Sequence, residues 1–153
     1  MSTTQAPSPT IRKPGRKPAT PRKLFVNIPV ADVQRSIKFF EELGFTFNEQ
    51  FTDASGTAML VGEDAYFMFL THEKFLSFSK RPLADPRQAT GALFTLGVDS
   101  REAVDAMVNQ AVGLGGTPAH EPQDHGFMYD WGFYDLDGHG WGVFWMDPAA
   151  VQG

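Results

Sequence analysis

The chain has 153 residues, 42% hydrophobic and 13% aromatic, which is typical of a single globular domain with a hydrophobic core. It contains no cysteine, which excludes disulfides, thiolate metal sites and a cysteine nucleophile. No apolar run approaches the roughly 20 residues that a membrane-spanning helix needs, and no apolar leader is present. We therefore expect a cytoplasmic protein without a membrane partner.

The net charge of −5 is unevenly distributed along the chain. Six of the 13 basic residues lie within residues 1–23, which contain no acidic residue, so the rest carries seven basic against 18 acidic side chains. Binding to nucleic acid needs a basic face, and we expect none on the folded part. Residues 1–22 are rich in Pro, Ser and Thr and predict a disordered tail, with contact to a polyanion as the alternative. Residues 148–153 are predicted to form a second tail.

Residues 24–71 have the pattern of a β–α–β–β–β unit. The first strand, 24–30, alternates as a strand buried on one side does. Asp32 is a suitable helix N-cap, and apolar residues then recur at helical spacing until Gly44, which predicts a helix between them. Three more strands are expected between turns rich in Gly, Asp and Ser: residues 45–51, 57–61 and 65–71.

The same pattern restarts after a proline-interrupted connector, residues 72–91. A strand at 92–98 is followed by an N-cap at Ser100 and a helix that glycines end at 113–116. Three strands complete the second unit: residues 117–121, 127–134 and 140–146. Asp32 and Ser100 are 68 positions apart, which indicates two copies of one unit, 24–71 and 92–146, within a single domain at 23–147.

Short motifs support this reading. Residues 26–32, with Ser36, Phe39-Phe40 and Leu43-Gly44-Phe45, form a strand–helix motif, and residues 135–141 form a closing turn and strand. These resemble the first and last elements of the glyoxalase/bleomycin resistance/extradiol dioxygenase group, the vicinal oxygen chelate superfamily. Residues 121–129 resemble a segment of its glyoxalase-like bacterial members. The resemblance implies an α+β fold of two βαβββ modules whose mixed strands curve into a cup, with helices on its outer face.

The resemblance also implies a divalent metal, held by His, Gln or Glu on the first and last strand of each module. The four corresponding strands contain no His, Asp, Glu, Gln or Cys: residues 24–30, 65–71, 92–98 and 140–146. We therefore expect no metal and no cofactor in this protein.

Strand alternation predicts which side chains face the cup, because neighbouring residues point to opposite faces. The predicted ligand-binding residues are Phe25, Asn27, Phe69, Leu93, Thr95, Tyr129, Trp131, Gly142 and Phe144. Gly140 and Gly142 on one strand face leave room for a ligand. His125, next to Asp124, is the candidate catalytic base or ligand contact at the rim, and the alternative is an ordinary loop histidine. His139 is expected to be a solvated turn residue.

These residues predict a metal-free protein that binds an apolar or aromatic small molecule in its cup and forms a homodimer. One alternative is an enzyme, a lactoylglutathione lyase-like or other lyase or isomerase that uses His125. The other alternative is a dimeric interaction module, in which the aromatic cup only closes a dimer.

Overall fold

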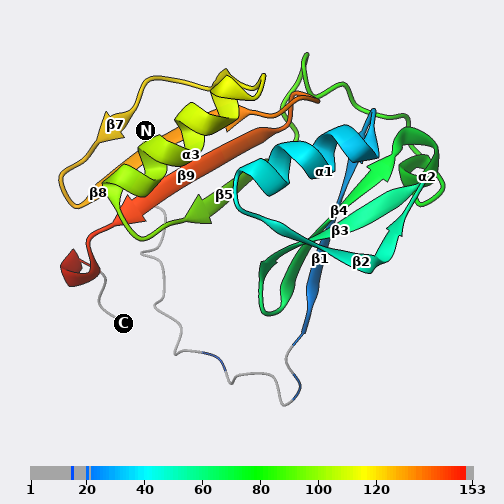
Figure 1. Ribbon diagram of the computed structural model, residues 1–153, viewed down its shortest axis with the longest axis horizontal. Coiled ribbons are helices and arrows are strands. Elements are labelled where there is room, and N and C mark those ends of the chain that lie inside the picture. Colours follow the sequence, from blue (N-terminus) through cyan, green and yellow to red (C-terminus); the bar gives the residue numbers. More distant parts are fainter. Residues whose placement is uncertain (1–14, 16–19, 21, 151–153) are drawn as a thin grey trace, which may run out of the picture.

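The computed structural model describes residues 15, 20 and 22–150 (Figure 1). The predicted disordered tail falls almost entirely on residues outside this part, as does the end of the predicted C-terminal tail. Within the described part, nine strands form two curved mixed sheets, accompanied by three α-helices and one 3-10 turn. The expected α+β fold is thus confirmed.

The N-terminal module comprises one helix and four strands. Its elements are β1 (Leu24–Val30), α1 (Val33–Glu42), β2 (Thr46–Asp53), β3 (Gly56–Gly62) and β4 (Ala65–Thr71). The sheet order is β1-β4-β3-β2, with β1 parallel to β4 and the other pairs antiparallel. Asp32 caps α1 by accepting a hydrogen bond from the Arg35 amide, and Gly44 follows the helix with a φ of 99°, which favours glycine.

The C-terminal module repeats this arrangement after the short helix α2 (His72–Leu76). Its elements are β5 (Leu93–Gly97), α3 (Arg101–Gly113), β6 (Thr117–Pro118), β7 (Gln123–Asp124), β8 (Met128–Tyr134) and β9 (Gly140–Met146), before the 3-10 turn Pro148–Ala150. The sheet order is β5-β9-β8-β6, and β7 also pairs with β8. The predicted strand 117–121 is shortened and β7 is added, because Pro118 and Pro122 have no N–H to donate to a ladder.

The two modules share one aromatic core on the helix-facing sides of their sheets. Phe40 of α1 packs against Phe69 of β4 and Trp141 of β9, with ring centroids 5.0 Å apart in each pair. Phe67 packs at 4.9 Å from both Trp141 and Phe94 of the C-terminal module. Figure 1 shows α1 and α3 on the same side of the two sheets. The Gln110 side chain of α3 donates a hydrogen bond to the carbonyl of Glu42, at the end of α1. The opposite side of each sheet, turned away from this core, is called its open face below.

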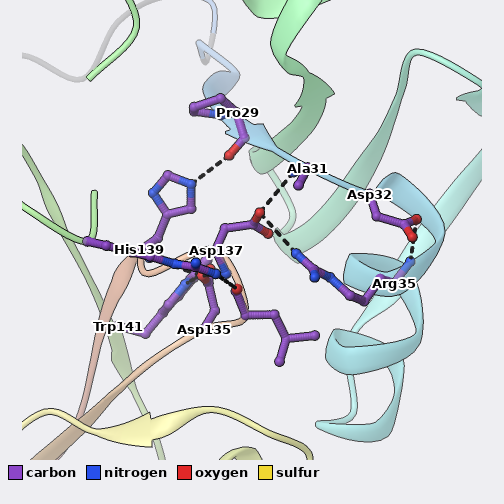
Figure 2. Close-up of polar contacts among 10 residues, drawn as sticks. Pro29, Ala31, Asp32, Arg35, Asp135, Asp137, His139 and Trp141 are labelled. Carbon is purple, nitrogen blue, oxygen red and sulfur yellow. Dashed lines mark hydrogen bonds and ion pairs between the residues drawn. The ribbon is translucent and has the colours of Figure 1, made fainter. Parts of the chain in front are cut away.

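The turn between β8 and β9 is connected to the first module by hydrogen bonds (Figure 2). The buried carboxylate of Asp135 accepts hydrogen bonds from the Trp141 indole and from the amides of Asp137 and His139, at 2.9–3.0 Å. Burial raises the pKa of Asp135, although the three donors and the nearby His139 oppose this effect. The Asp135 carboxylate therefore holds the backbone of the turn in one conformation.

Two side chains of this turn reach the β1–α1 junction of the other module (Figure 2). The Asp137 carboxylate accepts from the Ala31 amide at 2.8 Å and from the Arg35 guanidinium at 3.2 Å. His139 Nε2 donates to the Pro29 carbonyl at 2.7 Å. The prediction of a solvated His139 is therefore wrong, since its ring is half-buried and bonded across the module boundary. No helix in the described part is long and apolar enough to cross a bilayer.

Candidate functional site

The open face of the C-terminal sheet contains a hollow of about 550 Å³, called the C-terminal hollow here. Register explains which residues surround it. Thr95 lies opposite Gly142, which lies opposite Gly132, so the middle of the floor has almost no side chains. Larger side chains from the same face form the walls: Leu93, Met128, Phe144 and Met146.

The two floor glycines are constrained by close packing. A Cβ on Gly132 would lie 2.7 Å from the Trp141 carbonyl oxygen, a distance that real Cβ atoms do not tolerate. A Cβ on Gly142 would lie 3.1 Å from Thr95 Oγ1, so Thr95 would have to move by a few tenths of an ångström. The open floor therefore follows from these two positions being glycine.

Asp130 is the sole carboxylate among the described residues that line the hollow. Its side chain is 25% exposed, and its Oδ2 lies 3.2 Å from His125 Nε2. His125 itself is exposed on the turn between β7 and β8, at the edge of the hollow. The structure thus joins the predicted histidine to a carboxylate of the hollow, rather than to its neighbour Asp124.

Asp124 has a separate partner that fixes this turn. The Arg101 guanidinium, at the start of α3, bonds to the Asp124 carboxylate at 2.5 Å and to the Gly126 carbonyl at 2.8 Å. It also lies over the rings of Trp145 and Tyr129, at 5.1 and 5.7 Å from their centroids. The bond from Arg101, followed by that from the Gly126 amide, lowers the pKa of Asp124. Arg101 therefore clamps both residues that flank His125.

Four predicted ligand-binding residues come together at the C-terminal hollow, and a fifth lies at its edge. The four are Leu93, Thr95, Gly142 and Phe144. The fifth, Trp131, packs partly against the core, and its indole N–H donates to the His120 carbonyl at 2.7 Å. The hollow is thus built from one module only.

The other predicted residues lie elsewhere. Phe69 is fully buried in the shared core, because it pairs with Ile28 on the helix-facing side. Tyr129 also points to that side, where its hydroxyl donates to Asp105 of α3 at 2.5 Å. This bond is the largest of the effects that raise the pKa of Tyr129 to about 12. Phe25 and Asn27 are exposed on the open face of the N-terminal sheet and do not line this hollow.

Sequence reasoning missed Asp130, Met128 and Met146 as lining residues. The signal was present in the alternation of the two strands, since Met128 and Asp130 share the parity of Gly132 on β8, and Met146 shares that of Gly142 on β9. Using that signal requires the register between β8 and β9, which pairs Asp130 with Phe144 and Met128 with Met146.

Comparison with known proteins gives one family match. A model of the bleomycin resistance protein-like N-terminal domain matches residues 22–62. Many solved structures share the fold. A hypothetical protein from S. aureus has a TM-score of 0.71 at 25% identity, covering 82% of this chain and 95% of that one. No curated protein matches the chain.

Two further structures have the same architecture at lower identity. A glyoxalase/bleomycin resistance protein/dioxygenase family enzyme from Burkholderia phytofirmans has a TM-score of 0.67 at 21% identity, covering 80% of this chain and 96% of that one. A glyoxalase/bleomycin resistance protein/dioxygenase from Nocardioides has a TM-score of 0.65 at 15% identity, covering 90% and 91%. The chain therefore has the fold of structures from the glyoxalase/bleomycin resistance/dioxygenase superfamily, and its residues 22–62 match the family model of a bleomycin resistance protein-like N-terminal domain.

The metal that this superfamily implies does not fit the residues present. On the open faces, the first strands offer Phe25, Asn27, Leu93 and Thr95, and the paired last strands offer Tyr66, Met68, Gly140 and Gly142. None of these side chains is a carboxylate or imidazole, the donors that such an ion prefers. In residues 22–150 as described, no three His, Asp or Glu side chains converge so that they could hold a metal.

Proposed function

We propose that this glyoxalase-like protein binds an apolar or aromatic small molecule in the C-terminal hollow, without a metal. The observation that carries the proposal is the glycine floor, which leaves a concave space of about 550 Å³ on a face whose walls are apolar. Small-molecule pockets commonly measure about 300–1,000 Å³ and combine apolar walls with a few polar groups. The polar side chains of the lining include Asp130, Thr95, His120 and Gln123.

We further propose that the protein acts as a homodimer. Phe25 and Leu93 are 51% and 66% exposed on the open faces of the two sheets, and Leu60 is also exposed. Phe25 stacks on Tyr66 with ring centroids 4.9 Å apart, which creates a flat aromatic surface. Exposed apolar surface of this kind favours covering by a partner, and a second copy would close the hollow from above. Sedimentation analysis of the wild type and Phe25→Asp tests this, and a monomeric wild type would contradict it.

The binding proposal is tested by a substitution that fills the hollow with a larger side chain. Thr95 is exposed and faces the hollow, so Thr95→Phe places a ring there while keeping a residue that favours strands. We expect the affinity for the neutral probe 1-naphthylmethanol, measured by calorimetry, to fall by at least about tenfold, since the ring occupies the space of the ligand. Addition of EDTA should leave wild-type binding unchanged.

Thr46→Phe is the matched control, because Thr46 is also exposed on a strand but belongs to the N-terminal sheet. It should bind the probe as the wild type does, and both variants should keep the wild-type melting temperature. Absence of binding by the wild type, or equal binding by Thr95→Phe, would contradict the proposal.

A second candidate function is catalysis with His125 as general base. The 3.2 Å contact between His125 and Asp130 favours it, because a carboxylate orients and supports an imidazole base. Formation of lactoylglutathione from methylglyoxal and glutathione would support this alternative if His125→Gln abolished it. Equal rates in both proteins would exclude a role for His125.

A further inference from the structure

We propose that Asp130 makes the C-terminal hollow selective for ligands that carry a positive charge beside an aromatic or apolar body. The inference rests on the proposed binding function and names the class of ligand. It starts from the position of Asp130, the one carboxylate among the described residues that line the hollow.

The Asp130 carboxylate is held toward the hollow and only partly paired. The residue lies opposite Phe144 in the β8–β9 ladder, which places both side chains on the open face. Within the described chain, its side chain has one hydrogen bond, which Oδ2 accepts from His125 Nε2. A carboxylate can accept several hydrogen bonds, so Oδ1 is available to a donor in the hollow.

The surrounding charges leave Asp130 as the anionic group of the site. The described residues that line the hollow include no Lys, Arg or Glu. Besides Asp130, their ionisable side chains are Tyr134 and His120, and His120 Nδ1 lies 2.7 Å from the Glu121 carbonyl. Asp124 is paired with Arg101, and Asp105 accepts from Tyr129 on the far side of the sheet. A carboxylate that is three-quarters buried gains most from a cationic partner, and it repels an anionic one.

Aromatic side chains next to Asp130 favour the same ligand. Phe144 lines the hollow and directly faces Asp130 across the ladder, and Tyr134 lies on the same face of β8 as Asp130. Ring faces attract cations, and they also pack against the planar body of an aromatic ligand. An amine or ammonium group on an aromatic frame therefore matches the carboxylate and the rings together.

The test compares three probes that share a naphthalene body: 1-naphthylmethylammonium, 1-naphthylmethanol and 1-naphthaleneacetate. Calorimetry at pH 7.5 and low salt should show the cation binding the wild type about tenfold more tightly than the alcohol, with the anion weakest, as one partly buried ion pair can provide. Asp130→Asn keeps the shape and removes the charge. It should bind the cation and the alcohol equally.

Asp64→Asn is the matched control, because it removes one acidic charge at an exposed turn of the other module. It should keep the preference for the cation. A measurement on the wild type alone provides a second test. Raising the salt concentration should weaken binding of the cation but not of the alcohol, because ions screen the pairing with Asp130.

The outcomes separate the two proposals. Equal binding of cation and alcohol to the wild type, or a cation preference that survives Asp130→Asn, overturns the selectivity while binding of the alcohol still supports the proposed function. Failure of all three probes to bind overturns the proposed function and the selectivity with it. Loss of the preference in Asp130→Asn alone supports the inference.

Discussion

The two modules present equivalent open faces that differ in one respect, the size of the side chains in the middle. Matching the ladders residue by residue places Asn27 with Thr95, Met68 with Gly142, Tyr66 with Gly140 and Ala58 with Gly132. The N-terminal face carries side chains at all four positions, whereas three of the four in the C-terminal face are glycine. The same backbone architecture is thus filled in one module and hollow in the other.

The helix-facing sides show the opposite relation. Phe67 and Trp141 occupy matching positions on β4 and β9, and their rings contact each other at 4.9 Å in the shared core. Large aromatic residues lie where the two modules meet, and small residues lie on the open face of the C-terminal sheet, where a ligand could enter. The comparison shows that two modules of the same architecture can both place an aromatic residue in the shared core and still differ on the open face, because the two sides of a strand carry different residues.

The largest expected effect comes from breaking the shared joint. Trp141→Ala should lower the free energy of unfolding by about 3–5 kcal/mol, because the indole is buried against four other rings and its N–H satisfies Asp135. Phe67→Ala, at the matching position of the N-terminal module, should cost less, about 3 kcal/mol, since it leaves a smaller cavity and no unpaired carboxylate. Urea unfolding of both variants measures this, and independent unfolding of the two modules in the wild type would contradict a shared core.

An intermediate effect on binding is expected when one residue of the C-terminal open face is replaced by its counterpart in the N-terminal module. Gly142→Met gives the C-terminal face the residue that its N-terminal counterpart has. The side chain should fill the hollow and reduce binding of 1-naphthylmethanol by about tenfold or more, while the shift of Thr95 costs about 1 kcal/mol of stability.

The double variant Gly142→Met with Thr95→Ala separates these two effects. Removing the Thr95 hydroxyl and methyl relieves the contact at 3.1 Å, so stability should recover while binding stays weak. Recovery of binding together with stability would show that the hollow is not the site where the probe binds.

The smallest effect concerns Tyr129 on the helix-facing side. Because its bond to Asp105 raises its pKa from the usual 10.0 to about 12, its absorbance at 295 nm should rise only near pH 12. The stabilisation from this bond is present below pH 10 and is lost as the pH rises through about 12. Tyr129→Phe should remove the late step of the titration, and Asp105→Asn should move it to lower pH. A wild-type titration without a late step would contradict the contact.

Much of the fold could be predicted because its signals are local. The N-caps Asp32 and Ser100 each accept a hydrogen bond from the amide three residues on, as their side chains favour. The buried side of β1 followed from alternation alone. Alternation within one strand does not say which of its faces is buried, so the sequence predicts Phe69 in the cup, whereas its pairing with Ile28 on β1 places it in the core.

The chain's sequence by itself determined the two modules, their helices, the apolar strand faces and the lack of metal donors on the four strands where the superfamily places them. These depend on capping, periodicity and residue type, which act over a few neighbours. Tertiary structure decided the register that brings Asp130 beside Phe144, and the long-range bond from His139 to Pro29. Both join residues on different segments, so they follow from how the sheets pair and pack rather than from any local pattern.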